Sequence, residues 1–115
     1  MLSASNRLRK KVEVERVLFK GKQAGNQFFF LRYYKQSVKS ELSSARATVV
    51  VGKKFHNKAV KRNRIKRQVR HILRGIITQP KNSGIDFAVI VKKQAEGASY
   101  LELKKSLNGL FIYRK

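Results

Sequence analysis

The spacing of apolar residues divides this chain into segments of helical and of extended character. Over 12–20, apolar residues recur at mostly helical spacing and Gly21 follows them, which predicts a short helix. Residues 26–34 (NQFFFLRYY) are dense in aromatics, while 47–51 (ATVVV) and 85–91 (IDFAVIV) are short and apolar. These compositions are typical of β-strands.

The remaining segments complete one predicted domain. The pattern allows a short strand over 22–24, and the polar segment 35–45 (KQSVKSELSSA) indicates a loop. Helices are expected over 58–78 and 98–113, the first of them ended by Thr78, Pro80, Asn82 and Gly84. This order predicts an α+β fold, a two-layer α/β sandwich with helices against a small mixed sheet. Without a repeat or long linker, 1–115 forms a single domain.

Strand alternation assigns the side chains of 26–34 to two faces. One face would carry Phe28, Phe30, Arg32 and Tyr34. The other would carry Phe29, Leu31 and Tyr33. Two interpretations stay open for these aromatics: stacking platforms for unpaired bases, or ordinary core and sheet surface.

The segment 58–78 combines an apolar stripe with a cationic side. At about 100° per residue, one stripe of the helix collects Ile65, Val69, Ile72, Leu73 and Ile76. The opposite side collects Asn63, Lys66, Arg67, Arg70 and Arg74. The pattern therefore predicts a helix that is anchored in the core on one side and presents positive charge on the other.

Charge around this helix has a single sign. No acidic residue stands between Glu41 and Asp86, whereas the same span holds twelve Lys or Arg. Like-charged neighbours destabilise a helix, and the net charge of +22 adds self-repulsion across the whole chain. A polyanionic partner explains this charge better than local stability does. Nucleic acid is the first candidate and an anionic membrane surface the second.

Composition excludes or disfavours several other classes of protein. The chain has no cysteine, so disulfides, thiolate catalysis and cysteine metal sites are excluded. No apolar run approaches the length of a membrane span, and the first residues lack the apolar core of a secretion signal. An intracellular soluble protein is expected. The apolar stripe of 58–78 is needed for the core, which disfavours a membrane-surface helix or a nuclear-localisation tract.

RNA fits the expected layout better than duplex DNA. A helix-turn-helix needs a second short helix just before the basic one, and here a strand and the loop GKKFHN come first. The histidines and the six acidic residues form no recognisable triad or metal cluster, and no glycine-rich phosphate loop is present. His71 is expected to be a surface cation or a phosphate contact rather than a base.

Two motifs resemble the signature of the protein subunit of bacterial ribonuclease P. VVGKK is followed by seven residues and then by RNRIKRQVR, so that a strand ending in two lysines leads into a helix with an RNR core. RLRKK near the N-terminus, FKG at 19–21, the aromatic strand, and IDFAVIVKK before the last helix follow the family's order. The resemblance covers nearly the whole chain and is sharp over 49–74.

The resemblance implies a fold like domain 2 of ribosomal protein S5, with a left-handed βαβ crossover. It implies a noncatalytic protein without a cofactor of its own, which pairs with a catalytic RNA. That RNA uses Mg²⁺ to cleave the 5′ leader from precursor tRNA. The expected partners are this RNA and precursor tRNA in the bacterial cytoplasm, with no membrane and no small-molecule substrate.

The expected RNA-binding residues come from the motif and from the charge of the helix. The motif carries over to Lys53, Lys54, Arg62, Asn63, Arg64, Lys66, Arg67 and Arg70. The cationic helix adds Lys61 and Arg74.

The resemblance also implies a cleft between the RNR helix and the sheet that receives the single-stranded leader. Some members have Phe at the cleft positions of the first helix, where this chain has Val14 and Leu18. The sheet-side tyrosine of some members falls at Arg32 or Tyr33. With Phe30 and Tyr34, these residues are the candidates for leader contact.

Three alternatives share parts of this composition. A ribosomal or ribosome-associated RNA-binding protein would have the same size and charge, and the RNR motif after GKK argues against it. A protein nuclease acting alone would cleave through an acid or a histidine such as Asp86 or His71. A DNA-binding regulator would prefer duplex DNA to structured RNA.

Overall fold

The chain folds as a four-stranded sheet with helices on both faces. The computed structural model describes residues 6–8, 10–35, 45–52, 54–79, 82 and 84–113. The strands in this part of the chain are β1 (Lys22–Gly25), β2 (Phe29–Lys35), β3 (Arg46–Val50) and β4 (Ile85–Val91). The helices are α1 (Lys11–Lys20), α2 (Ala59–Ile77) and α3 (Tyr100–Tyr113), with a short 3₁₀ helix, η3, at Lys93–Ala95.

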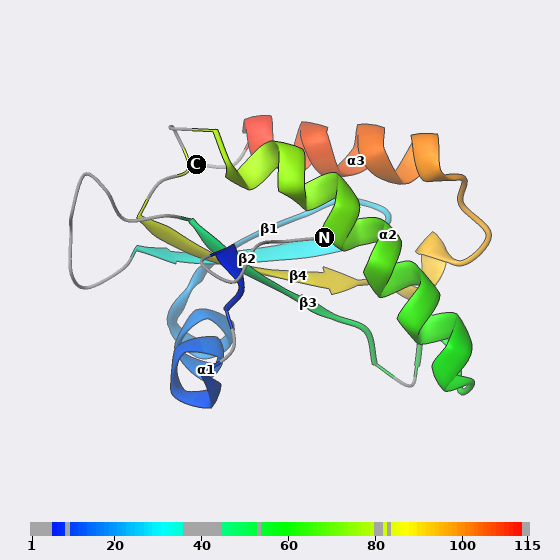
Figure 1. Cartoon of the computed structure of the whole chain (residues 1–115), viewed down its shortest axis with the longest axis horizontal. Helices are drawn as coiled ribbons and strands as arrows, with labels where there is room; N and C mark the ends of the chain where they lie inside the picture. Colours follow the sequence, from blue (N-terminus) through cyan, green and yellow to red (C-terminus); the bar gives the residue numbers. More distant parts are fainter. Residues whose placement is uncertain are drawn as a thin grey trace.

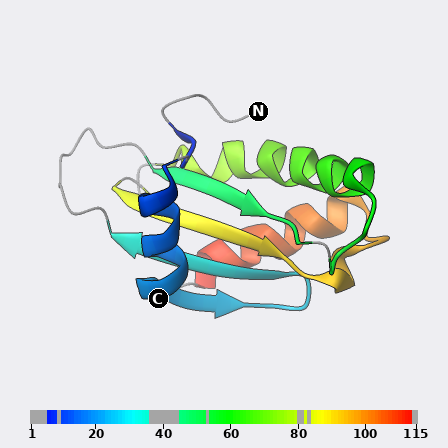
Figure 2. The same cartoon turned by 90° about the horizontal axis from the view of Figure 1, so that it is seen from below.

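The strand order is β1-β2-β4-β3, and the sheet is mixed. β2 pairs antiparallel with both β1 and β4, whereas β3 and β4 are parallel and are joined through α2. Figure 2 shows β3 and β4 pointing the same way, with α1 in front of the sheet and α2 behind it. The crossover is therefore left-handed, as the resemblance implies, although most such connections are right-handed. The predicted α+β class with a small mixed sheet is confirmed.

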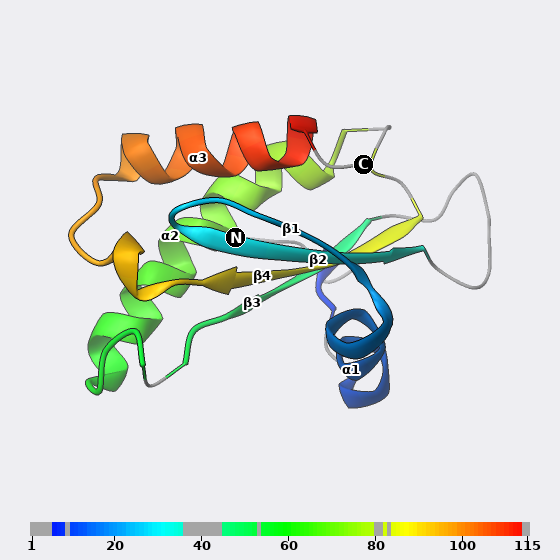
Figure 3. The ribbon, with the colours of Figure 1, turned by 180° about the vertical axis from the view of Figure 1, so that it is seen from behind.

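Helices α2 and α3 lie side by side over one face of the sheet, and α1 crosses the other face at one end (Figure 1). The view from behind shows the β1–β2 hairpin at the edge of the sheet opposite to β3 (Figure 3). The main core lies between the sheet and α2 and α3, where the Phe87 and Phe111 ring centroids are 4.9 Å apart. A smaller core of Leu8, Val17 and Ala88 lies beneath α1.

Most predicted boundaries agree with the observed ones within a residue or two. The short strand that the pattern allows over 22–24 is present as β1. β2 begins at Phe29 rather than at 26, because the Asn26 side chain accepts hydrogen bonds from the N–H groups of Phe28 and Phe29 and closes a turn there. The expected loop 35–45 lies outside the described residues except for its two end residues.

Gly21 is required where α1 meets the sheet. A Cβ atom at this position would lie 2.4 Å from the Val17 carbonyl oxygen and 2.9 Å from that of Tyr33. Neither oxygen can move far, because both belong to the backbone of regular elements. The glycine of the FKG motif thus permits a close approach between the end of α1 and β2.

A charged cluster ties α1 to the sheet. Arg46 Nε and Nη2 donate to the two carboxylate oxygens of Asp86, each at 2.8 Å. Arg46 Nη1 lies 2.7 Å from Glu13 Oε2, so one guanidinium joins α1, β3 and β4. Hydrogen bonds first to Asp86 and then to Glu13 raise the pKa of Arg46, against the opposing effect of burial.

Helix α3 begins with a reciprocal cap, and we expect the stability that this cap gives to depend on pH. The Ser99 N–H donates to Glu102 Oε1 at 3.0 Å, and the Glu102 N–H donates to Ser99 Oγ at 3.1 Å. The backbone and side-chain hydrogen bonds from Ser99 lower the pKa of the Glu102 carboxyl. The cap therefore stabilises α3 above the ordinary pKa of glutamate, and this stabilisation is lost as the pH falls through the lowered value.

An NMR titration of the Glu102 carboxyl carbon checks this expectation. We expect a midpoint below the ordinary glutamate value, and a partial return toward that value in Ser99→Ala, which keeps the backbone donor. A midpoint at the ordinary value in the unmodified chain would show that the cap does not persist in solution.

Candidate nucleic-acid interface

Helix α2 is anchored by its apolar stripe. Its buried residues are Ile65, Val69, Ile72, Leu73, Ile76 and Ile77. The side chains pack with β2, β3, β4 and α3 in the main core. Because this stripe fixes the rotation of the helix, it also decides which residues face solvent. The predicted amphipathic arrangement is confirmed.

Outside the buried stripe, α2 carries a cationic ridge, which we define as Lys61, Asn63, Arg64, Lys66, Arg67, Arg70 and Arg74. Lys66 and Arg70 are half-buried and the other five residues are exposed. Within the described ranges, the ion pairs join Lys11 to Glu15 and Arg46 to Glu13 and Asp86, and none reaches the ridge. The positive charge is thus left to an external anion.

The first turn of α2 adds to the positive electrostatic potential of the cationic ridge. Its N-cap residue, Lys58, makes no side-chain capping hydrogen bond, and no acidic residue lies in the first turn. The positive end of the helix dipole is therefore not neutralised within the helix itself.

Arg62 of the RNR motif stabilises the turn that precedes α2. Its Nη1 donates to the carbonyl oxygens of His56 and Asn57 at 2.8 Å and 2.9 Å. The side chain is half-buried and holds the turn that leads into α2. Arg62 therefore shapes the start of the helix, whereas its neighbours of the cationic ridge project outward.

The two lysines of the VVGKK motif follow β3. Lys54 is exposed in the turn between β3 and α2. Lys53 lies outside the described residues. Lys54 thus adds a further positive charge near the N-terminal end of the cationic ridge.

Five of the six candidate leader residues share one face of the sheet, the side that carries α1. Val14, Leu18 and Tyr34 pack against the smaller core beneath α1. Phe30 and Arg32 share the face of Tyr34 because they are four and two residues from it along β2. We call this surface the α1-side face.

Arg32 and Phe30 have different environments on the α1-side face. Arg32 donates to Gln23 Oε1 at 2.8 Å and to the Gly21 carbonyl at 2.9 Å, which joins β2 to the end of α1 and to β1. Phe30 is 37% exposed, and Lys92 Nζ lies 4.1 Å from its ring centroid. Phe30 therefore offers an accessible aromatic ring beside a cation.

Two expectations about the leader site need correction. Tyr33 packs against the main core on the opposite face, because side chains alternate along β2. The leader cleft was expected between the RNR helix and the sheet, yet that space is filled by the main core. The remaining candidates lie on the α1-side face, which α1 crosses at only one end (Figure 2).

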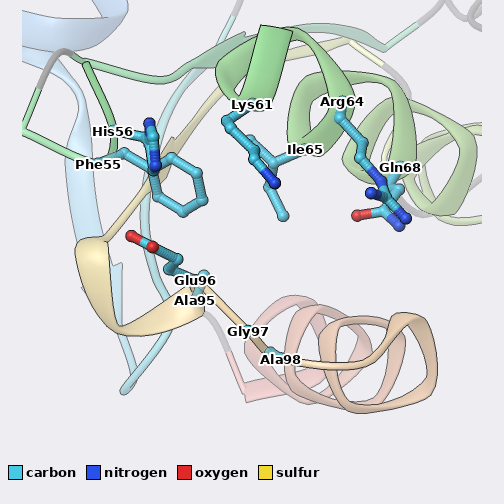
Figure 4. Close-up of a pocket in the computed structure, with 10 residues that line it drawn as sticks. All are labelled: Phe55, His56, Lys61, Arg64, Ile65, Gln68, Ala95, Glu96, Gly97 and Ala98. Atoms are coloured by element: carbon cyan, nitrogen blue, oxygen red, sulfur yellow. The ribbon is translucent and has the colours of Figure 1, made fainter. Parts of the chain in front are cut away.

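Two adjoining hollows lie along α2 and were not expected from the sequence. The first hollow, of about 390 Å³, lies between α2 and the segment that joins η3 to α3 (Figure 4). It is lined by Phe55, His56, Lys61, Arg64, Ile65, Gln68 and Ala95 to Ala98. The second hollow, of about 460 Å³, is lined by Val60, Arg64, Arg67, Gln68, His71 and Tyr100.

Sequence patterns did not reveal several residues that line these hollows, and most of these residues belong to the segment that faces α2. Gln68 had a signal, since it follows Lys61 and Arg64 by seven and four positions on the same helix. Glu96 and Tyr100 had none, because the fold brings them to α2 from a distant segment. His71, expected as a surface cation, is exposed, with its ring centroid 6.1 Å from that of Tyr100.

Metal clusters and membrane spans are both absent from the described residues. These residues contain no group of three or more His, Asp or Glu placed to hold a metal ion. None of their helices is both long enough and apolar enough to cross a membrane.

Comparison with known proteins gives a consistent result. The family model described as "Ribonuclease P" matches residues 2–114. The "Ribonuclease P protein component" of Bacillus cereus (strain AH187) is 38% identical over 113 residues, covering 96% of this chain and 91% of that protein.

Solved structures agree with the sequence comparison. The RNase P protein from Thermotoga maritima, in complex with 1-(4-fluorophenyl)-2-thiourea, matches with a TM-score of 0.79 and 28% identity, covering 95% of this chain and 100% of that one. A Staphylococcus aureus RNase P protein mutant with defective mRNA degradation activity matches with a TM-score of 0.81 and 25% identity, covering 94% and 86%.

Proposed function

This chain belongs to the Ribonuclease P family, and from that membership we propose that it binds the catalytic RNA of ribonuclease P and the 5′ leader of precursor tRNA. Its relatives are protein components of ribonuclease P, so the chain serves in the maturation of tRNA 5′ ends. The ribosomal alternative is not favoured by any of the similar proteins.

The observation that carries this proposal is the unpaired charge of the cationic ridge. Apolar anchors on the buried side hold the ridge in place, and no acid of the described residues forms an ion pair with it. Arg and Lys that face solvent in this way neutralise phosphates and release the counterions of RNA. The ridge therefore suits a folded RNA, here the RNA subunit.

In this proposal the RNA subunit carries out the cleavage, with Mg²⁺ bound to RNA. The described residues hold no group of three or more His, Asp or Glu that could bind a metal ion, and three of their carboxylates are engaged elsewhere. Glu13 and Asp86 are held by Arg46, and Glu102 is held by the cap of α3. The protein contributes by binding and positioning the two RNAs, which lowers the magnesium concentration needed to bind substrate. Both RNAs would meet this chain in the bacterial cytoplasm.

The salt dependence of RNA binding tests the role of the cationic ridge. About six phosphate contacts would give a log–log slope of affinity against salt concentration of about −4 to −5. A filter-binding titration of ribonuclease P RNA over a range of salt concentrations measures this slope. A slope near zero would contradict binding through phosphates.

For the leader we propose the α1-side face. Phe30 offers a partly exposed ring on which an unpaired base can stack, and the Lys92 ammonium, which also donates to the Asn26 carbonyl, adds a positive charge beside this ring. Val14 and Leu18 of α1 border the face with apolar side chains. This surface is separated from the cationic ridge by the sheet, so the two RNAs can be held at the same time.

Replacing Phe30 by Ala is expected to lower the affinity of the holoenzyme for precursor tRNA by about fivefold or more, through the loss of one stacking platform. Binding of mature tRNA, which has no leader, should be unchanged. The matched control is Phe19→Ala, which removes a ring that is 79% exposed on α1. Equal losses for precursor and mature tRNA would remove Phe30 from the leader site.

A further inference from the structure

The two hollows lie beside the cationic ridge, share some of its residues and add other chemical groups to it. In the first, Lys61 and Arg64 supply positive charge, Ile65 supplies an apolar floor, and Glu96 supplies a carboxylate. Figure 4 shows Glu96 on the side of Phe55 and His56, and Arg64 with Gln68 at the opposite end. The hollow thus has a cationic end and an end with a hydrogen-bond acceptor.

Glu96 is the unusual member of this set. It is exposed and enters none of the ion pairs formed among the described residues, although Lys61 and Arg64 line the same hollow. A carboxylate repels phosphate and accepts hydrogen bonds from amino groups, such as N4 of cytosine. The Glu96 end therefore favours the edge of a base, and the Arg64 end favours a phosphate.

The second hollow offers an aromatic surface. Tyr100 is 38% exposed, its ring is tilted by 48° to that of His71, and Val60, which is 77% exposed, borders the same hollow. Partly exposed rings of this kind stack on unpaired bases of any type, because every base has a flat aromatic face. The second hollow therefore suits a stacked base rather than a second phosphate.

Arg64 and Gln68 line both hollows. A phosphate joins the sugars of two successive nucleotides, so a cation that borders both hollows can reach the phosphate between two nucleotides whose bases occupy them. The volumes of about 390 and 460 Å³ fall within the usual range for small-ligand sites.

We propose that these hollows hold two successive unpaired nucleotides of RNA, with Glu96 accepting a hydrogen bond from an amino-bearing base, Arg64 on the phosphate between them, and Tyr100 stacked on the second base. The proposal rests on the RNA-binding function proposed above and specifies which nucleotides one part of that interface recognises. It predicts that adenine, cytosine or guanine is preferred to uracil, which has no amino group, in the first hollow.

The test compares oligocytidylate with oligouridylate of equal length, because their bases are alike in size and differ in the amino group. Fluorescence anisotropy with the full chain at low salt should show about fivefold tighter binding of the cytidine strand. In Glu96→Gln the preference should fall to about one, since an amide both donates and accepts. Glu15→Gln, the same charge change on α1, should keep the preference.

Tyr100→Leu should weaken both strands by about fivefold or more and leave their ratio unchanged. Equal binding of the two strands by the unmodified chain, or a preference that survives Glu96→Gln, would overturn the proposal while RNA binding stands. Absence of binding to either strand at low salt would instead overturn the RNA-binding function itself.

Discussion

Replacing Arg67, Arg70 and Arg74 together by Gln is expected to weaken binding of ribonuclease P RNA by about 100-fold near physiological salt. Each guanidinium belongs to the cationic ridge and has no acidic partner within the described chain. Through counterion release, each phosphate contact contributes about fivefold to affinity near physiological salt, and each lost contact lowers the salt slope by about one. The slope should therefore become shallower by about 2 to 3.

The matched control removes the same charge from elsewhere. Lys22, on the edge strand β1, and Lys104 and Lys105, on α3, are all exposed. Their triple replacement by Gln should lower affinity only through net charge, by less than about tenfold. The ridge variant should stay folded, because removing like charges from one helix does not destabilise it. Equal losses for the two triple variants would show that RNA binding depends on net charge and not on the ridge.

Arg46→Met is expected to lower the free energy of unfolding by about 3 kcal/mol. The Asp86 side chain is 4% exposed, and this change removes the two hydrogen bonds that Arg46 gives it. A buried carboxylate that loses a charged partner is costly, whereas the methionine retains much of the apolar stem. The same change frees Glu13, so α1 loses an attachment to β3 and β4.

Urea unfolding followed by circular dichroism measures this loss. The control is Lys11→Met, which breaks an exposed pair in which Lys11 Nζ and Glu15 Oε1 are 4.0 Å apart. Exposed pairs of this type contribute about 0.5 kcal/mol or less, so the control should unfold nearly as the unmodified chain does. An Arg46 variant as stable as the control would show that the cluster does not hold α1 to the sheet. Because α1 borders the α1-side face, we also expect the Arg46 variant to discriminate less between precursor and mature tRNA.

The helical spacing of 58–78 is sufficient to predict α2, its buried stripe and its cationic side. A single periodicity predicts all three features, since an amphipathic helix has only one rotation about its axis that buries its apolar residues. The alternation of side chains along a strand likewise separates Phe30 and Arg32 from Tyr33. Local pattern decides such features because they depend on neighbours within a turn of helix or along one strand.

Features formed by distant segments do not follow from local sequence patterns. Arg46 meets Asp86 forty positions away, and Glu96 and Tyr100 face α2 only because α3 packs beside it. The face of the sheet that α1 covers depends on how the chain leaves Gly21, and no periodicity encodes that direction. The family resemblance supplied the left-handed crossover, which runs against the usual hand and could not come from local pattern.

Cleavage of precursor tRNA at low magnesium tests the proposed role of this chain most directly. The reaction contains bacterial ribonuclease P RNA with and without the full chain, and the chain alone serves as the control. We predict efficient cleavage at the mature 5′ end only when RNA and protein are combined. Cleavage by the chain alone, or no gain when it is added to active RNA, would contradict the proposal.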